Sequence, residues 1–130
     1  MRIIKYSLLL TVLLLPAWGT TSAQTAAKRI TPPAVVKGAI GGESHDAYVL
    51  RARQGQRLTL RISWKKDGDN RVEFTVSAGA NFFEAEPVKF GEEANGGKSW
   101  TGVVPATRRY YIYLVAHPSA HYTLRVTLGK

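Results

Sequence analysis

The sequence contains no cysteine, only one methionine, and half as many acidic residues as basic ones. Without cysteine the chain can form no disulfide, offers no thiolate nucleophile or thiolate metal ligand, and carries no cysteine-linked lipid. Asp and Glu number 9 against 18 Lys and Arg, which gives a formal charge of +9 at pH 7. Such a positive field speeds encounter with anionic partners, although it does not identify them.

Motifs of catalysis and of metal binding are also missing. No Gly-x-Ser-x-Gly elbow and no glycine-rich phosphate loop occurs, so we predict no catalytic residues and no enzyme activity. The run from Asp67 to Asn70 is typical of a turn and lacks the later glutamate of a calcium loop. His117 and His121 have no third ligand at zinc-site spacing. We therefore expect no metal and no cofactor.

The longest apolar run lies near the start of the chain, from Ser7 to Leu15, behind the basic residues Arg2 and Lys5. It is shorter than the roughly 20 residues that a membrane span needs, and small residues follow it up to Ala23. This order is typical of a secretory signal. We predict a signal peptide over residues 1–23, a flexible lead over 24–33, and one domain over 34–130. The mature protein should be periplasmic or secreted, where anionic envelope polymers, lipid phosphates or acidic proteins, and not nucleic acid, are the expected partners.

The rest of the chain alternates between apolar and polar residues with the period of β-strands. Turn-forming clusters separate these stretches at Gln54–Gln56, Lys65–Asn70 and Asn95–Gly97. Weaker strands are expected at 35–40, 82–90 and 99–104. The pattern predicts an all-β protein, a two-sheet antiparallel β-sandwich (jelly-roll-like) of about seven or eight strands. The residues predicted to point inward are Tyr48, Leu50, Leu60, Ile62, Phe74, Ile112, Leu124 and Val126.

Arginines are frequent at polar positions of two successive predicted strands. They are Arg51, Arg53, Arg57 and Arg61. If Gln54–Gln56 closes a hairpin, Arg53 faces Arg57 and all four share one outer face. Like charges directly opposite one another destabilise a sheet, and a bound anion would offset that cost. The alternatives are a solvated face paired with acids such as Glu73, or a chain that arches between the two sheets and splits the arginines over two surfaces.

Tyr111 and Tyr113 are predicted to point away from the apolar residues of their own strand. Beside Arg108 and Arg109 they would form an aromatic-basic patch, suited to stacking a sugar ring or to anchoring a protein contact. Alternatively, another part of the chain covers this face, or the tyrosines pair across strands.

For four other large aromatic residues the sequence predicts only whether they are packed or exposed. Phe82 and Phe83 cannot both point inward on a regular strand, so one of them should be exposed in a loop or mark a bulge. Trp64 and Trp100 are expected to pack in the core or at its rim.

The order of apolar and turn residues resembles that of a known family. It runs from Tyr48 to Leu60 around Gly55 and Gln56, and continues through Phe74–Val76, Trp100–Gly102 and Tyr122–Val126. This order is similar to that of the bacterial pre-peptidase C-terminal type β-sandwich and, more narrowly, of the periplasmic inhibitors of g-type lysozyme. The likeness covers about Ala34 to Leu128 and rests on core and turn residues, which report the fold more than the activity.

Two functions are compatible with these observations. The resemblance implies a non-catalytic inhibitor that occludes the cleft of g-type lysozyme; its first candidate contacts are Arg108, Arg109, Tyr111 and Tyr113, and the face from Arg51 to Arg61 is second. The alternative is a pre-peptidase C-terminal-like accessory module that binds anionic envelope glycan or lipid through the same side chains.

Overall fold

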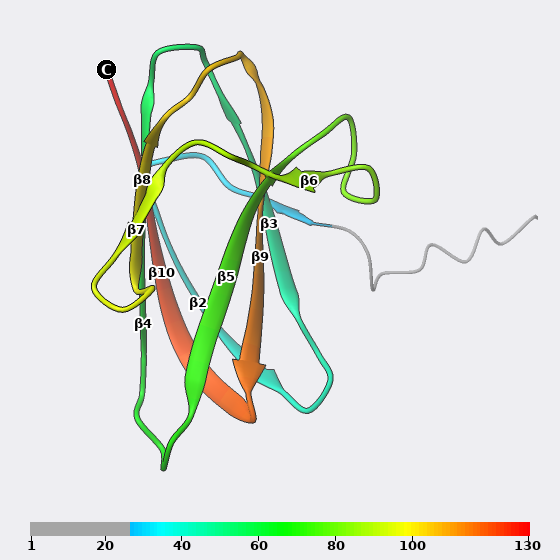
Figure 1. Ribbon diagram of the computed structural model, residues 1–130. Coiled ribbons are helices and arrows are strands. Elements are labelled where there is room, and N and C mark those ends of the chain that lie inside the picture. Colours follow the sequence, from blue (N-terminus) through cyan, green and yellow to red (C-terminus); the bar gives the residue numbers. More distant parts are fainter. Residues whose placement is uncertain (1–26) are drawn as a thin grey trace, which may run out of the picture.

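The computed structural model describes residues 27–130, and the predicted signal peptide lies outside this part of the chain. Over these residues the chain forms strands and no helix. The strands make two sheets that face each other, with orders β1-β3-β9-β5-β6 and β2-β10-β4-β8-β7 (Figure 1). We call them the first and the second sheet. The first contains β1 (Lys28–Arg29), β3 (Asp46–Ala52), β5 (Arg71–Ala78), β6 (Glu86–Pro87) and β9 (Arg108–His117). The second contains β2 (Ala34–Gly41), β4 (Arg57–Trp64), β7 (Glu92–Ala94), β8 (Ser99–Val103) and β10 (Ser119–Gly129).

The predicted two-sheet β-sandwich is confirmed, with ten strands within residues 27–130 in place of seven or eight. The extra strands are short edge pieces whose few residues show no clear alternation. One of them, β1, falls in the segment predicted as a flexible lead: it pairs with β3 in parallel, and Ile30 N–H donates to Val49 O at 2.9 Å. The weak strand expected over 82–90 is reduced to β6, because residues 81–85 form a turn.

Alternation along the long strands builds the core between the sheets. All eight residues predicted to point inward are buried, and so is Trp100, while Trp64 packs half-buried against the cluster. The strand pairs carry this pattern in register, so that Leu124 lies opposite Ile62 on one side and Val36 on the other. Successive strand residues point to opposite faces, and the residues between the buried ones therefore form the two outer faces.

The turn at Gln54–Gln56 decides which outer face each arginine occupies. It joins β3 of the first sheet to β4 of the second, so it arches between the sheets and closes no hairpin. Gly55 takes the left-handed conformation (φ 89°), which glycine adopts without strain, and its N–H donates to Val104 O at 2.8 Å. The hairpin expected at this point is wrong, and the alternative of an arch is the one observed.

A largely buried polar cluster joins the two sheets near the start of β3. Tyr122 donates its hydroxyl proton to Asp46 Oδ2 at 2.5 Å and is hydrogen-bonded to the hydroxyl of Tyr48. The Tyr122 ring fills the space above Gly38, where a Cβ would lie 2.5 Å from its hydroxyl oxygen. Every buried side-chain polar atom among the described residues has a partner, as a stable interior requires.

Candidate binding site

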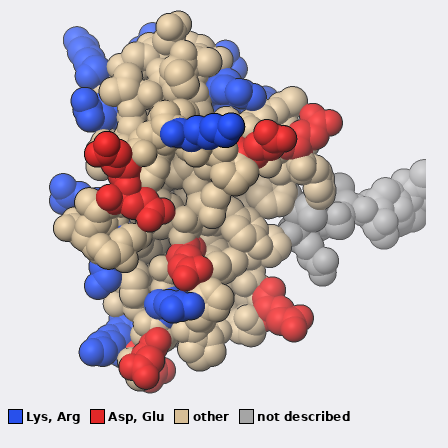
Figure 2. All heavy atoms as spheres, viewed as in Figure 1, with Lys and Arg blue, Asp and Glu red and all other residues tan. Residues whose placement is uncertain are grey.

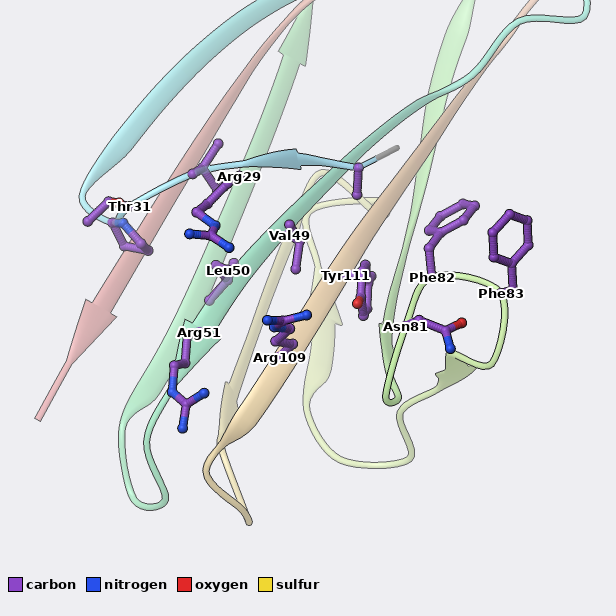
Figure 3. A pocket seen from close by; sticks show the side chains of 13 residues that line it. Arg29, Thr31, Val49, Leu50, Arg51, Asn81, Phe82, Phe83, Arg109 and Tyr111 are labelled. Atoms are coloured by element: carbon purple, nitrogen blue, oxygen red, sulfur yellow. The ribbon is translucent and has the colours of Figure 1, made fainter. Parts of the chain in front are cut away.

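A groove runs over the outer face of the first sheet, where β1, β3 and β9 lie side by side (Figure 3). Its volume is about 820 Å³. Two rows of residues cross the strands beneath it. In one row Arg29 pairs with Val49, which pairs with Tyr111; in the next, Arg51 pairs with Arg109. Three guanidinium groups from three strands therefore border one hollow.

Aromatic side chains form the other end of the groove. The ring of Phe82 lies edge-on to Tyr111, with centroids 6.0 Å apart, and also contacts Tyr113 and the ring of His45. Phe83 lies beyond Phe82 at the outer end of the groove and is 76% exposed, the most exposed large apolar side chain of residues 27–130. The groove thus passes from a basic end to an aromatic wall with a projecting phenyl ring.

The loop that carries the phenylalanines is held by its backbone. At Gly79 a Cβ would come within 2.7 Å of the backbone of Ala85, so the two arms of the loop pack directly on each other. Asn81 Oδ1 accepts the N–H of Glu84 at 3.0 Å, and Val88 N–H donates to Val76 O at 2.9 Å. These contacts place Phe82 over the outer face of β9.

No acidic side chain lines the groove. Among residues 27–130 the only ion pair between permanently charged groups is that of Glu73 with Arg71 at 3.5 Å, and Glu73 also lies 3.5 Å from His117 Nε2. Arg29, Arg51 and Arg109 therefore have no acidic partner there. Arg51 and Arg109 are directly opposite in an antiparallel pair, an arrangement that costs several tenths of a kcal/mol through repulsion. A bound anion would offset that repulsion by attracting both guanidinium groups.

The structure brings some of the predicted binding residues together and separates the others. Arg51, Arg109 and Tyr111 share the groove, and Tyr113 lies half-buried beside it. Arg108 is exposed and points to the opposite side of β9 from Arg109, because adjacent strand residues alternate. Arg53 is exposed in the turn after β3. Arg57 and Arg61 lie on β4 of the second sheet, so the single arginine face is wrong.

Tyr111 is also less accessible than predicted. It faces outward as the alternation requires, but it is only 5% exposed, because Phe82 and the groove residues cover it. The alternative of a covered face is the one observed. The prediction for the two neighbouring phenylalanines is confirmed, since Phe82 is packed and Phe83 is exposed in a loop.

Arg29 is the groove residue that sequence reasoning missed. It follows Lys28 in a two-residue strand, too short to show a period of two. Its only local signal is a basic pair before the apolar Ile30, which packs against the core. Pairing with β3, which is remote in sequence, is what places it beside Arg51.

Other kinds of site have no support among the described residues. No three His, Asp or Glu side chains in 27–130 are arranged to hold a metal ion. No helix in the same range is long and apolar enough to cross a membrane. The Asp67–Asn70 segment is a turn, as predicted: Asn70 Oδ1 accepts the N–H of Asp67 at 3.0 Å.

Fold and groove together define a small β-sandwich with a basic-aromatic groove on one outer face. No known sequence family and no curated protein matches the chain. Among solved structures the chain is similar to the Aeromonas hydrophila PliG, a periplasmic inhibitor of g-type lysozyme, with 23% identity, a TM-score of 0.61, and coverage of 78% of this chain and 95% of that one.

Two further structures have the same architecture. One is the pre-peptidase C-terminal domain of a collagenase from Bacillus anthracis, with 20% identity, a TM-score of 0.56, and coverage of 78% of this chain and 95% of that one. The other is the Salmonella Typhimurium PliG, also a periplasmic inhibitor of g-type lysozyme, with 17% identity, a TM-score of 0.54, and coverage of 78% and 97%. At these identities the likeness shows the fold, which is that of the family the sequence pattern resembles.

Proposed function

We propose that this protein is a non-catalytic, periplasmic inhibitor of g-type lysozyme that acts by surface contact. The observation that carries the proposal is the three-arginine groove, free of acidic lining residues, on a fold shared with two inhibitors of that enzyme. Lysozyme clefts carry catalytic carboxylates, and guanidinium groups pair with carboxylates through two parallel hydrogen bonds. Cationic side chains on one face are therefore suited to an acidic cleft.

Phe83 supplies the apolar contact of the proposed interface. Its ring projects from a loop whose base is anchored by Phe82 against Tyr111, so ordering it on binding costs little entropy. Exposed aromatic anchors beside arginines are the usual centres of binding energy in protein interfaces. In this proposal the Phe83 ring packs against the lysozyme surface, while Arg109 and Arg51 face the acidic groups of the lysozyme.

The test is inhibition of cell-wall lysis by a g-type lysozyme. Wild-type protein should inhibit at micromolar concentration. Phe83→Ala and Arg109→Gln should each weaken inhibition at least tenfold, or about 1.4 kcal/mol. Arg125→Gln is the matched control, because it removes the same charge from the second sheet, and it should inhibit like wild type. Unchanged lysis with wild-type protein, or an equal loss in the control, contradicts the proposal.

A second candidate function follows from the size of the groove. A volume of about 820 Å³ with an aromatic wall and three arginines also suits an acidic glycan fragment, as expected of an accessory module. Calorimetric titration with soluble peptidoglycan fragments separates the two functions. Binding that Arg109→Gln abolishes, together with unchanged lysis, favours the glycan module over the inhibitor.

A further inference from the structure

The outer face of the second sheet is basic over β2, β4, β8 and β10 and is separate from the groove. On β2, β4, β8 and β10, the residues that alternate with the buried ones include no Asp and no Glu. The cationic residues among them are Lys37, Arg57, Arg61 and Arg125, with His121 beside them. In Figure 2 Lys and Arg side chains project along the side on which β4 lies in Figure 1. We call this surface the basic face.

The basic face has its own pair of opposed arginines. Arg61 of β4 lies directly opposite Arg125 of β10. Neither forms an ion pair within residues 27–130. By register the acid that points the same way is Glu92 on the edge strand β7, and β8 separates it from β4. Repulsion between the two guanidinium groups is thus uncompensated unless an anion lies over them.

The shape of the basic face argues for a flat partner. Its charges spread in two dimensions: Arg57 and Arg61 are about 13 Å apart along one strand, and neighbouring strands are about 4.8 Å apart. The other outward side chains on these four strands are mostly threonine, serine, alanine and valine, and the imidazole of His121 is the one outward ring. The face therefore offers no row of aromatic rings for the stacking of successive bases or sugars. Binding of single-stranded nucleic acid relies on such stacking.

One shallow hollow of about 380 Å³ lies at an end of this face. Lys37, Lys65 and His121 border it, and the hydroxyl groups of Ser63 and Thr123 lie among them. Ammonium and hydroxyl donors around a small hollow suit a phosphate group.

We propose that the basic face docks on the surface of a bilayer that contains anionic phospholipid, with a lipid phosphate in the hollow beside Lys37. The contact is electrostatic and peripheral, since the face presents only Val35 and Val103 as exposed large apolar side chains, at its edges. It leaves the groove on the opposite sheet free, so it does not depend on the inhibitor function.

Co-sedimentation of the mature protein with phosphatidylcholine vesicles, with and without phosphatidylglycerol, tests the proposal. Protein should bind only the anionic vesicles. Arg61→Gln/Arg125→Gln should weaken this binding about 30-fold, the equivalent of ~1 kcal/mol for each charge removed near an anionic surface. The double variant should fold at least as well as wild type in thermal unfolding, because it removes a like-charge pair.

Arg51→Gln/Arg109→Gln is the matched control, since it removes an equal charge from the other opposed pair. Its vesicle binding should stay within about threefold of wild type, because sheets lie about 10 Å apart and the Debye length at physiological salt is about 8 Å. An equal loss in both double variants overturns the proposal, as does failure to bind anionic vesicles.

Two further readouts complete the experiment. A single-stranded oligonucleotide, at the same phosphate concentration, should bind more weakly than the vesicles; tighter binding assigns the face to a nucleic acid and rejects the lipid. Lysozyme inhibition should persist in Arg61→Gln/Arg125→Gln. The two proposals can therefore fail separately.

Discussion

Replacing Tyr122 by phenylalanine should lower the free energy of unfolding by about 3 kcal/mol. The side chain is 2% exposed, and its hydroxyl joins β10 to β3 through Asp46 and Tyr48. A hydrogen bond to a carboxylate contributes about 1.5–3 kcal/mol and a neutral one about 1 kcal/mol. In the variant, water reaches the half-buried Asp46 and replaces part of the hydrogen bonding that its carboxylate loses. Tyr48, in contrast, is 4% exposed, and its hydroxyl is left unpaired.

Urea denaturation of single and double variants measures this network. Tyr48→Phe/Tyr122→Phe should cost less than the sum of the single changes by about 1 kcal/mol, since the two hydroxyls share one hydrogen bond. Tyr113→Phe is the control. Its hydroxyl makes no hydrogen bond within residues 27–130, so its removal should change stability by less than about 0.5 kcal/mol. Additive effects of the two buried tyrosines would refute the shared network.

The same network predicts how stability falls in alkali. Burial, and then the hydrogen bonds with Asp46 and Tyr48, hold the pKa of Tyr122 well above its ordinary value. Burial also raises the pKa of Tyr110, although its bond to Ala106 O and the charge of Arg108 oppose the shift. Above about pH 10 the unfolded tyrosines lose protons that the folded ones keep, so the folded state binds more protons and stability falls as pH rises.

Above about pH 10, each tyrosine with a raised pKa lowers the free energy of unfolding by about 1.4 kcal/mol per pH unit. Below about pH 10 its stabilising contribution is fully present. Urea midpoints at several pH values should therefore fall more steeply for wild type than for Tyr122→Phe. Equal slopes for the two proteins would show that the Tyr122 hydroxyl titrates as it does in the unfolded chain.

Three other changes test the fold and its processing. Gly38→Ala should destabilise the protein by about 2 kcal/mol in urea denaturation, since the new Cβ would meet the pinned Tyr122 ring; a neutral result would show that the ring moves freely. Asn70→Ala should cost about 2 kcal/mol by the same measurement, because Asn70 Nδ2 donates to Lys65 O and Ser119 O and ties the Lys65–Asn70 turn to β10. N-terminal sequencing of exported protein should begin at or near Gln24, and retention of Met1 would contradict the predicted signal peptide.

The long strands were predictable because the alternation of apolar and polar residues lies within the sequence of each strand. In β4 and β10 the apolar residues recur at every second position over eight and eleven residues, so the sequence of each segment identifies its buried face. The edge strands β1 and β6 are two residues long and hold no such pattern. They form because a neighbouring strand offers unpaired backbone N–H and C=O groups. Which strand lies next to them is decided by the tertiary structure and not by their own residues.

The candidate site was only partly predictable for the same reason. That Arg51 and Arg109 face outward follows from local alternation, and both were named from the sequence. That they lie opposite one another follows from the pairing of β3 with β9, residues far apart in the chain. The cover over Tyr111 comes from Phe82, whose position depends on a loop folded around Gly79.

The arch at Gly55 determines how the arginines are divided between the two sheets. A tight turn of this kind permits two outcomes, a hairpin in one sheet or a crossing to the other, and the three residues at its centre do not distinguish them. A hairpin would have set Arg53 against Arg57 on one face. The crossing instead gives each sheet one opposed pair, Arg51 with Arg109 and Arg61 with Arg125. Because the core separates the two pairs, an anion bound to one would do little for the other, and the partner proposed for each face needs its own test.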